Sequence, residues 1–173
     1  MKKRIILVAV LSIFVFSCSK YSDQLEVVEK HIQKNLSEIE RRNINYNCVE
    51  MSDREALEEI ISFDRIKLET ANKNLDEYQK KYDLGKFRTR SFDNMSAAEL
   101  KNYVRIYEFG KSYSNQVKIC TNHYSNHLKE FSKLKGLNPY YKVEVLKVDP
   151  DTIIHRKVYL NDKNKIIYTK AYK

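Results

Sequence analysis

The sequence contains few of the residues that break helices or form tight turns. Its 173 residues include three glycines, two prolines and no tryptophan. Because glycine and proline punctuate secondary structure, their scarcity favours long helices joined by few tight turns. The same scarcity argues against the glycine-rich loops that cradle phosphate groups.

The motifs of common enzyme classes are also missing. The chain has neither the G-x-S-x-G elbow of serine hydrolases nor the H-E-x-x-H motif of zinc proteases. We therefore expect a protein that is not an enzyme and that needs no cofactor. A metal-dependent or hydrolytic enzyme is the least favoured function.

The first twenty residues differ from the polar remainder of the chain. A basic cluster, Lys2, Lys3 and Arg4, precedes an unbroken run of apolar or small residues at positions 5–16. A positive cluster followed by an apolar core of this length is typical of an export signal. The run is shorter than the ~20 apolar residues that span a bilayer, and no later stretch is longer.

The end of this run, Val15-Phe16-Ser17-Cys18, resembles the lipobox of bacterial lipoproteins. It has an aliphatic residue, then a small residue directly before the cysteine. The resemblance implies a signal peptide at residues 1–17, cleavage before Cys18, a diacylglyceryl group on the Cys18 thiol and an acylated amino group. More than one acyl chain anchors a protein stably in a membrane. An ordinary signal peptide with a cysteine near its end is the alternative.

The residue after the cysteine bears on the destination. In Gram-negative lipoproteins an aspartate there marks retention at the inner membrane, and this chain has Ser19. The resemblance therefore implies the outer membrane, with the protein facing the periplasm or the cell exterior. Residues 18–24 would form a lipidated tether, and residues 25–173 a single domain.

Positive charge exceeds negative charge over the whole chain. Three positive charges of the formal net +9 lie in the leader, so the remaining chain carries +6. Lysines and glutamates are interleaved, which is mostly a feature of a soluble surface, although basic charge also attracts anionic headgroups or acidic polysaccharide. No nucleic-acid-binding motif is present, and we expect no nucleic-acid partner.

Apolar residues at three- and four-residue steps predict three helices. The first begins near Ser22 and fades near residues 41–43, after which residues 43–51 are expected to form a loop. Capping-box patterns, Ser52 with Glu55 and Ser96 with Glu99, mark the starts of two longer helices. These should end near residues 84 and 135, with Gly85 suited to the C-cap of the first.

Each long helix carries an apolar stripe. The stripe of the first follows a four-three alternation typical of a coiled coil, interrupted by one carboxylate. Its members are Leu57, Ile61, Asp64, Leu68, Ala71, Leu75, Tyr78 and Tyr82. The expected stripe of the second comprises Leu100, Tyr103 or Val104, Tyr107, Val117, Cys120, Tyr124, Leu128 and Phe131. Gly110 and Ser114 lie along it, where small side chains either let a neighbouring helix approach closely or mark a local kink.

After Gly136 the apolar period changes to two. This alternation predicts strands at residues 141–148, 153–160 and 166–172. The expected fold class is α+β, mostly α: a long antiparallel helical bundle or hairpin followed by a three-stranded antiparallel sheet at about residues 140–173. The apolar face of the sheet should lie against the helices, because three strands alone are marginally stable.

Two cysteines remain once Cys18 is assigned to lipid. If the long helices pack antiparallel, the start of the first lies beside the last turns of the second, which brings Cys48 near Cys120. In an oxidising periplasm such a pair is normally a disulfide. The alternative is a tetrahedral zinc site, with His123 and His127 as the other two ligands.

Two further features have a functional and a structural interpretation. Asp64, in the apolar stripe, is either a buried carboxylate with a perturbed pKa at a functional site or a residue at a bundle edge or paired with a lysine. Tyrosines cluster in the strand region, where they could bind sugars or peptides, or fill the core and cross-strand pairs. They are Tyr140, Tyr141, Tyr159, Tyr168 and Tyr172.

These patterns favour a lipid-anchored protein of the cell envelope with a non-enzymatic binding or structural role. Its partner would be an envelope protein or a polysaccharide. The alternative is a small inhibitor or immunity-type lipoprotein that neutralises a toxin or a hydrolase.

Overall fold

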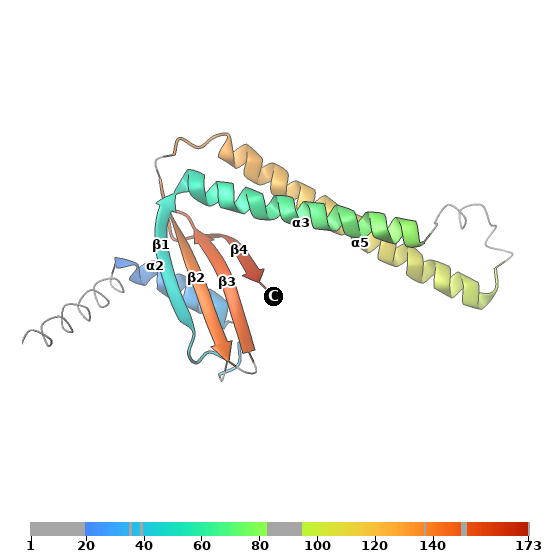
Figure 1. Ribbon diagram of the computed structural model, residues 1–173, viewed down its shortest axis with the longest axis horizontal. Helices are drawn as coiled ribbons and strands as arrows, with labels where there is room; N and C mark the ends of the chain where they lie inside the picture. The colour runs from blue at the N-terminus through green and yellow to red at the C-terminus, as the bar shows by residue number, and fades with distance from the viewer. Residues whose placement is uncertain are drawn as a thin grey trace, which may run out of the picture. The chain divides into compact units, whose positions relative to one another are not determined.

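The structure, a computed structural model, describes residues 20–34, 36–38, 40–82, 95–136, 138–149 and 152–172. The predicted signal peptide, the predicted lipidation site Cys18, Ser19 and the expected C-cap Gly85 lie outside these residues. The fold is α+β, as expected (Figure 1). Its elements are α2 (Ser22–Gln33), β1 (Asn45–Ser52), α3 (Asp53–Lys81), α5 (Ala97–Phe131), β2 (Pro139–Asp149), β3 (Thr152–Leu160) and β4 (Ile166–Tyr172).

Within the chain, contacts form two compact units. One, the sheet unit, combines residues 1–56 with 134–173, and the other, the helical hairpin, comprises residues 57–133. The hairpin is therefore an insertion in the sequence of the sheet unit. Among the described residues, no helix combines the length and the apolarity that crossing a bilayer requires.

The sheet unit contains four antiparallel strands in the order β1-β2-β3-β4. The three predicted strands are confirmed as β2, β3 and β4. The fourth, β1, pairs with β2 from Asn45 opposite Leu146 to Ser52 opposite Pro139. The sheet therefore joins chain segments that lie on either side of the hairpin insertion.

The loop predicted at residues 43–51 is wrong, because most of it forms β1. The segment has three asparagines, which strands disfavour, and this hid its alternation. In the structure Ile44, Tyr46 and Cys48 are partly buried, whereas the residues between them are exposed. Pairing with β2 supplies the stability that the local sequence lacks.

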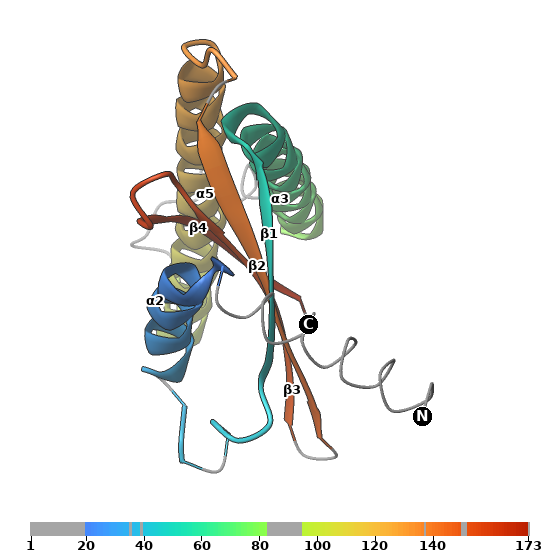
Figure 2. The same cartoon turned by 90° about the vertical axis from the view of Figure 1, so that its left-hand side faces the viewer.

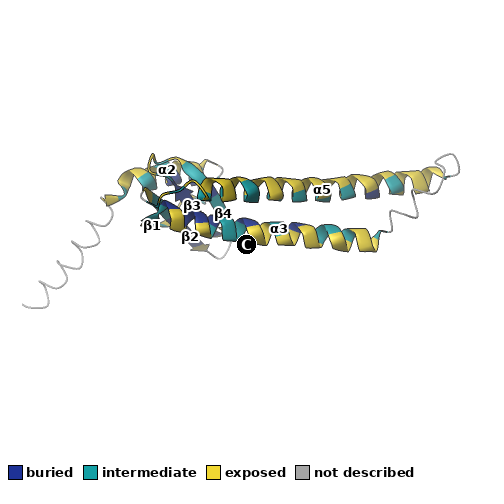
Figure 3. Ribbon diagram, turned by 90° about the horizontal axis from the view of Figure 1, so that it is seen from above, coloured by how far each residue is buried: buried dark blue, intermediate teal, exposed yellow. Residues whose placement is uncertain are grey.

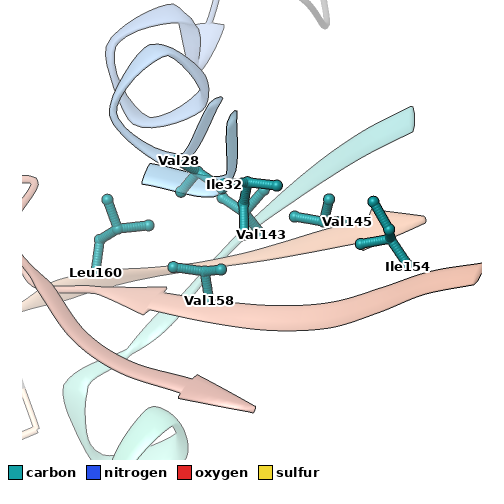
Figure 4. Packing of buried hydrophobic residues seen from close by; sticks show 7 residues of the cluster. All are labelled: Val28, Ile32, Val143, Val145, Ile154, Val158 and Leu160. Carbon is teal, nitrogen blue, oxygen red and sulfur yellow. The ribbon is translucent and has the colours of Figure 1, made fainter. Parts of the chain in front are cut away.

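Helix α2 covers one face of the sheet (Figure 2). Valine and isoleucine side chains of β2 and β3 point to this face, because alternate residues of a strand share a face. They pack against two residues of α2 to form the core of the unit (Figure 4). The buried cluster consists of Val28, Ile32, Val143, Val145, Ile154, Val158 and Leu160.

Helix α2 ends about eight residues earlier than its apolar stripe predicts. The hydroxyl of Ser37 donates to Glu40 Oε2 at 2.5 Å, and the Ser37 amide donates to the same oxygen at 2.8 Å. This is the pairing of a capping box, which starts a new turn instead of continuing the old helix. The hydrogen bonds to Ser37 lower the pKa of Glu40.

The predicted starts of both long helices are confirmed. At α3 the Glu55 amide donates to Ser52 Oγ at 3.2 Å, while Glu55 Oε2 accepts from the Ser52 amide at 2.9 Å. At α5 Ser96 and Glu99 form the same reciprocal box. These residues need only their own neighbours to form the motif, so the sequence predicts it without knowledge of the tertiary structure.

Helices α3 and α5 run side by side in the hairpin (Figure 3). They are antiparallel, because Asp64 contacts His127 and Tyr78 contacts Ile106. The predicted stripe of α3 is confirmed, since all of its members are buried or partly buried. We call the line along which the two helices meet the seam.

The predicted stripe of α5 is partly wrong. Leu100, Val104, Tyr107 and Leu128 are exposed, at 40%, 50%, 53% and 41% of their surface. Apolar residues occur in adjacent pairs at 103–104 and 106–107, so spacing alone did not identify the inner member. The positions of α5 that follow the seam are Tyr103, Ile106, Gly110, Tyr113, Val117, Cys120, Tyr124, His127 and Phe131.

We predict that Ile32→Ala lowers the free energy of unfolding of the sheet unit by about 2–5 kcal/mol, because it leaves a cavity between α2 and the sheet. Ile32 is 1% exposed, whereas its neighbour His31 is exposed. His31→Ala is the matched control and should change stability by less than about 0.5 kcal/mol. Urea titration monitored by circular dichroism measures both, and equal effects would contradict the packing of α2.

Candidate functional site: a groove in the helical hairpin

A tyrosine of α3 enters the seam where α5 has no side chain. The Tyr78 hydroxyl donates a short hydrogen bond to the carbonyl oxygen of Ile106, one turn before Gly110 on α5. A glycine leaves room above the backbone of α5 for the phenol. Burial, together with the neighbouring Tyr82 and Tyr113, raises the pKa of Tyr78 above its ordinary value.

Three tyrosine rings meet at this point. The ring centroid of Tyr78 lies 4.8 Å from that of Tyr82 and 5.1 Å from that of Tyr113, with interplanar angles of 42° and 41°. Such tilted arrangements are favourable for aromatic pairs. The cluster therefore forms a firm aromatic wall between the two helices.

A groove of about 480 Å³ opens beside this wall. Its volume lies within the range of ~300–1,000 Å³ typical of small-ligand sites. Both helices contribute side chains, which are mostly aromatic, amide or charged. The lining of this hairpin groove consists of Asn74, Glu77, Tyr78, Lys81, Tyr82, Asn102, Arg105, Ile106, Phe109 and Tyr113.

Among the described residues, the acidic side chain of the groove has an ion-pair partner, whereas its two basic side chains have none. Glu77, the one acidic residue among the described residues that line the groove, lies 3.8 Å from the amine of Lys73. The amine of Lys81 lies over the ring of Tyr82, 5.4 Å from the centroid. Within the described part of the chain, neither Lys81 nor Arg105 forms an ion pair with a carboxylate. The groove therefore presents positive charge beside aromatic surface.

Asp64 lies elsewhere on the seam, in a pair with a histidine. Its Oδ2 is 2.6 Å from Nδ1 of His127, and the two side chains are 3% and 15% exposed. The ring of His123 lies one turn away, with its centroid 6.5 Å from that of His127. Asp64 is therefore buried in the seam beside a histidine. A polar pair in a seam fixes the alignment of two helices.

The predicted disulfide is absent from the structure, where Cys48 and Cys120 are free thiols. The prediction assumed that Cys48 lies in a loop that leads into α3. It lies instead in β1, opposite Val143, so the sheet determines its position. Cys120 is partly buried on the seam of α5.

The alternative zinc site is likewise not assembled. Among the described residues, no three side chains of histidine, cysteine, aspartate or glutamate are grouped as metal ligands would be. His127 faces Asp64, whereas His123 is exposed on the same helix. The four-residue spacing therefore brings the two histidines close together, but they do not belong to a group of metal ligands among the described residues.

Of the five tyrosines predicted to cluster in the strand region, four follow one face of the sheet and the fifth follows the other; on the first face Tyr172 stacks on His155, with the ring centroids 4.3 Å apart. Tyr141 lies on the face covered by α2, whereas Tyr140 follows the opposite face, because adjacent residues of a strand alternate. Tyr159 and Tyr168 are opposite one another across strands, and both are buried. Their centroids lie 6.2 Å apart in an edge-to-face pair. These two fill the core, in agreement with the structural interpretation.

Sequence reasoning did not find the hairpin groove. Tyr78 and Tyr82 were assigned to the stripe of α3, and their contribution to a groove depends on which residues of α5 lie opposite. Arg105 and Phe109 belong to no motif and flank the seam instead of following it. The available signal was Gly110, a residue without a side chain in the middle of a tyrosine-rich stripe.

We predict that His127→Ala lowers the free energy of unfolding by about 3–5 kcal/mol, because it removes the imidazole from a buried carboxylate. Replacing both members, Asp64→Leu with His127→Leu, should restore most of this loss, because neither polar side chain is then left in the seam without the other. His123→Ala is the control, with an expected effect below about 0.5 kcal/mol. Urea unfolding of the four proteins tests the pair, and similar losses for the two alanine variants would refute it.

The thiol of Cys48 should react slowly. Burial, and to a smaller extent the charge of Glu50, raises its pKa to about 11. Because the thiolate is the reactive form, alkylation by iodoacetamide at pH 8 should be on the order of a hundredfold slower in the folded protein than in urea. A variant with Cys18→Ala and Cys120→Ala isolates this signal. Equal rates would contradict the burial, and a bridge in the wild type would appear as alkylation only after reduction.

Comparison with known proteins identifies no relative of this chain: no protein-family model matches it, and neither a curated protein nor a solved structure is significantly similar to it.

Proposed function

We propose that this chain is a lipid-anchored protein of the cell envelope that binds a ligand in the hairpin groove and does not catalyse a reaction on it. The groove is the observation that supports this proposal. It combines aromatic surface with amide and charged groups from two helices, and its volume lies within the range of small-ligand sites.

The composition of the groove favours binding over chemistry. Among the described residues that line it, there is no histidine, cysteine, serine or aspartate, so the lining offers neither a histidine base nor a serine or cysteine nucleophile. The hydroxyl of Tyr78 already donates a hydrogen bond to a backbone carbonyl oxygen, and its pKa is raised. Both features suit a rigid wall for a ligand.

The cellular address is a separate part of the proposal. It is supported by the basic and apolar leader and by the resemblance of residues 15–18 to a lipobox. Acyl chains on Cys18 would hold the protein at a membrane, with the outer membrane favoured by Ser19. Ligands of the groove would then be components of the envelope or its surroundings.

A second candidate function is inhibition of a protein partner. Leu100, Val104 and Tyr107 are spaced four and three residues apart and lie on one face of α5, each at least 40% exposed. An apolar patch of this kind on a helix is typical of contact with another protein. It favours an inhibitor or immunity-type lipoprotein over a metal-dependent enzyme as the second candidate.

The anchor is tested by metabolic labelling with a fatty-acid analogue. We expect wild-type protein to carry the label and to fractionate with membranes, and Cys18→Ala to lose both properties. Cys48→Ala is the matched control and should be labelled like the wild type. Equal labelling of wild type and Cys18→Ala would remove the lipid anchor from the proposal.

Ligand binding is tested by retention of solubilised envelope components on the immobilised protein. A variant with Phe109→Ala and Arg105→Gln should lose the retained component, because Phe109 is 54% exposed and lines the groove. The control, Ile119→Ala with Lys118→Gln, alters exposed residues of the same helix outside the hairpin groove and should retain it. Loss in both variants or in neither would place binding outside the groove.

A further inference from the structure

We infer that the ligand of the hairpin groove is a saccharide that carries a carboxylate, an inference that rests on the proposed binding function. Three observations on the groove lead to it: the exposed aromatic faces, the pair of amide side chains and the basic side chains that have no ion-pair partner among the described residues.

The aromatic surface suits the apolar face of a sugar ring. Phe109 is 54% exposed, while Tyr82 and Tyr113 are held at angles by their contacts with Tyr78. A pyranose presents axial C–H bonds on one face, which pack on an aromatic ring without losing hydroxyl hydration. Tyrosine adds a hydroxyl beside this surface for hydrogen bonding.

Amide side chains line the groove from both helices. Asn74 belongs to α3 and Asn102 to α5, so donors and acceptors reach a ligand from two sides. A carboxamide offers two donors and one acceptor oxygen, which matches pairs of neighbouring sugar hydroxyls. A peptide that binds by strand addition would need a free strand edge, and the groove, which is formed by two helices, provides none.

The charges select an acidic sugar over a neutral one. Arg105 and Lys81 line the groove without an ion-pair partner among the residues that the structure places, whereas Glu77 is already beside Lys73. Glu108, one turn after Arg105, lines a neighbouring hollow together with Arg105 and Phe109 and is not among the described residues that line the hairpin groove. A guanidinium is suited to a carboxylate, because its fork of donors matches the two oxygens.

The test uses isothermal titration of the purified full chain in detergent micelles with two oligosaccharides. One alternates N-acetylglucosamine with glucuronic acid, and the other is the same compound with each carboxylate reduced to an alcohol. We expect the acidic compound to bind more tightly, and its affinity to fall as sodium chloride is raised, because salt screens the attraction.

Variants separate the contributions. Arg105→Gln should weaken binding of the acidic oligosaccharide roughly tenfold or more, the loss expected when a charge-assisted hydrogen bond is removed, and leave the reduced compound unaffected. Phe109→Ala should weaken both compounds. Lys118→Gln and Ile119→Ala, on the same helix and outside the groove, should weaken neither. Circular dichroism checks that each variant remains helical.

Two results would overturn the inference. Equal affinity for the two compounds, with no effect of Arg105→Gln, would show that the groove does not select a carboxylate. Binding of neither compound, while the immobilised protein still retains an envelope component that depends on Phe109 and Arg105, would show that the ligand belongs to another class. In that second case the proposed binding function would stand and only the saccharide would fall.

Discussion

The pairing of β1 with β2 is the constraint on which the rest of the structure depends. The two strands are separated in sequence by the whole helical hairpin, yet they pair from Asn45 to Ser52 without interruption. Closing so long a segment carries an entropic cost that grows only slowly with its length. The ladder of backbone hydrogen bonds, with the core beneath α2, offsets that cost. Once the ladder forms, it fixes where the hairpin leaves the sheet and where it returns.

A second set of contacts joins the two segments of the sheet unit that flank the helical hairpin in the sequence. The Asp53 amide donates to the Asn138 carbonyl oxygen at 3.0 Å, and the Asn138 amide group donates to Asp53 Oδ2 at 3.2 Å. A buried carboxylate at the first residue of α3 also suits the positive end of the helix. The chain is therefore held together at the two positions where the insertion begins and ends.

Polar contacts then set the alignment of the helices within the hairpin. Apolar side chains slide past one another at little cost, whereas Asp64 with His127 and Tyr78 with the Ile106 carbonyl are satisfied in only one register. The groove follows from that register, because its two walls come from different helices. A shift by one turn would separate the amide and charged side chains that now line a common space.

Sequence reasoning reached what local chemistry determines. The serine and glutamate boxes at Ser52 and Ser96 need no distant partner, and the alternating residues of β2 to β4 are read from the chain alone. It failed where a distant segment decides. The asparagines of β1 hide a strand that pairing with β2 stabilises. Cys48 was expected in a loop and lies in β1. Arg105 lines the groove only because α3 lies beside α5.

The seam of the hairpin repeats every seven residues, and this has a consequence for how such a molecule can vary. Adding seven residues to each helix would keep every seam position facing inward. If the added residues lie between the groove and the base of the hairpin, the groove moves about 10 Å further from that base, because an α-helix rises about 1.5 Å per residue. The strands would be untouched, because both additions lie between them in the sequence. The length of the hairpin and the residues that line the groove can thus vary independently, provided that residues are added in multiples of seven.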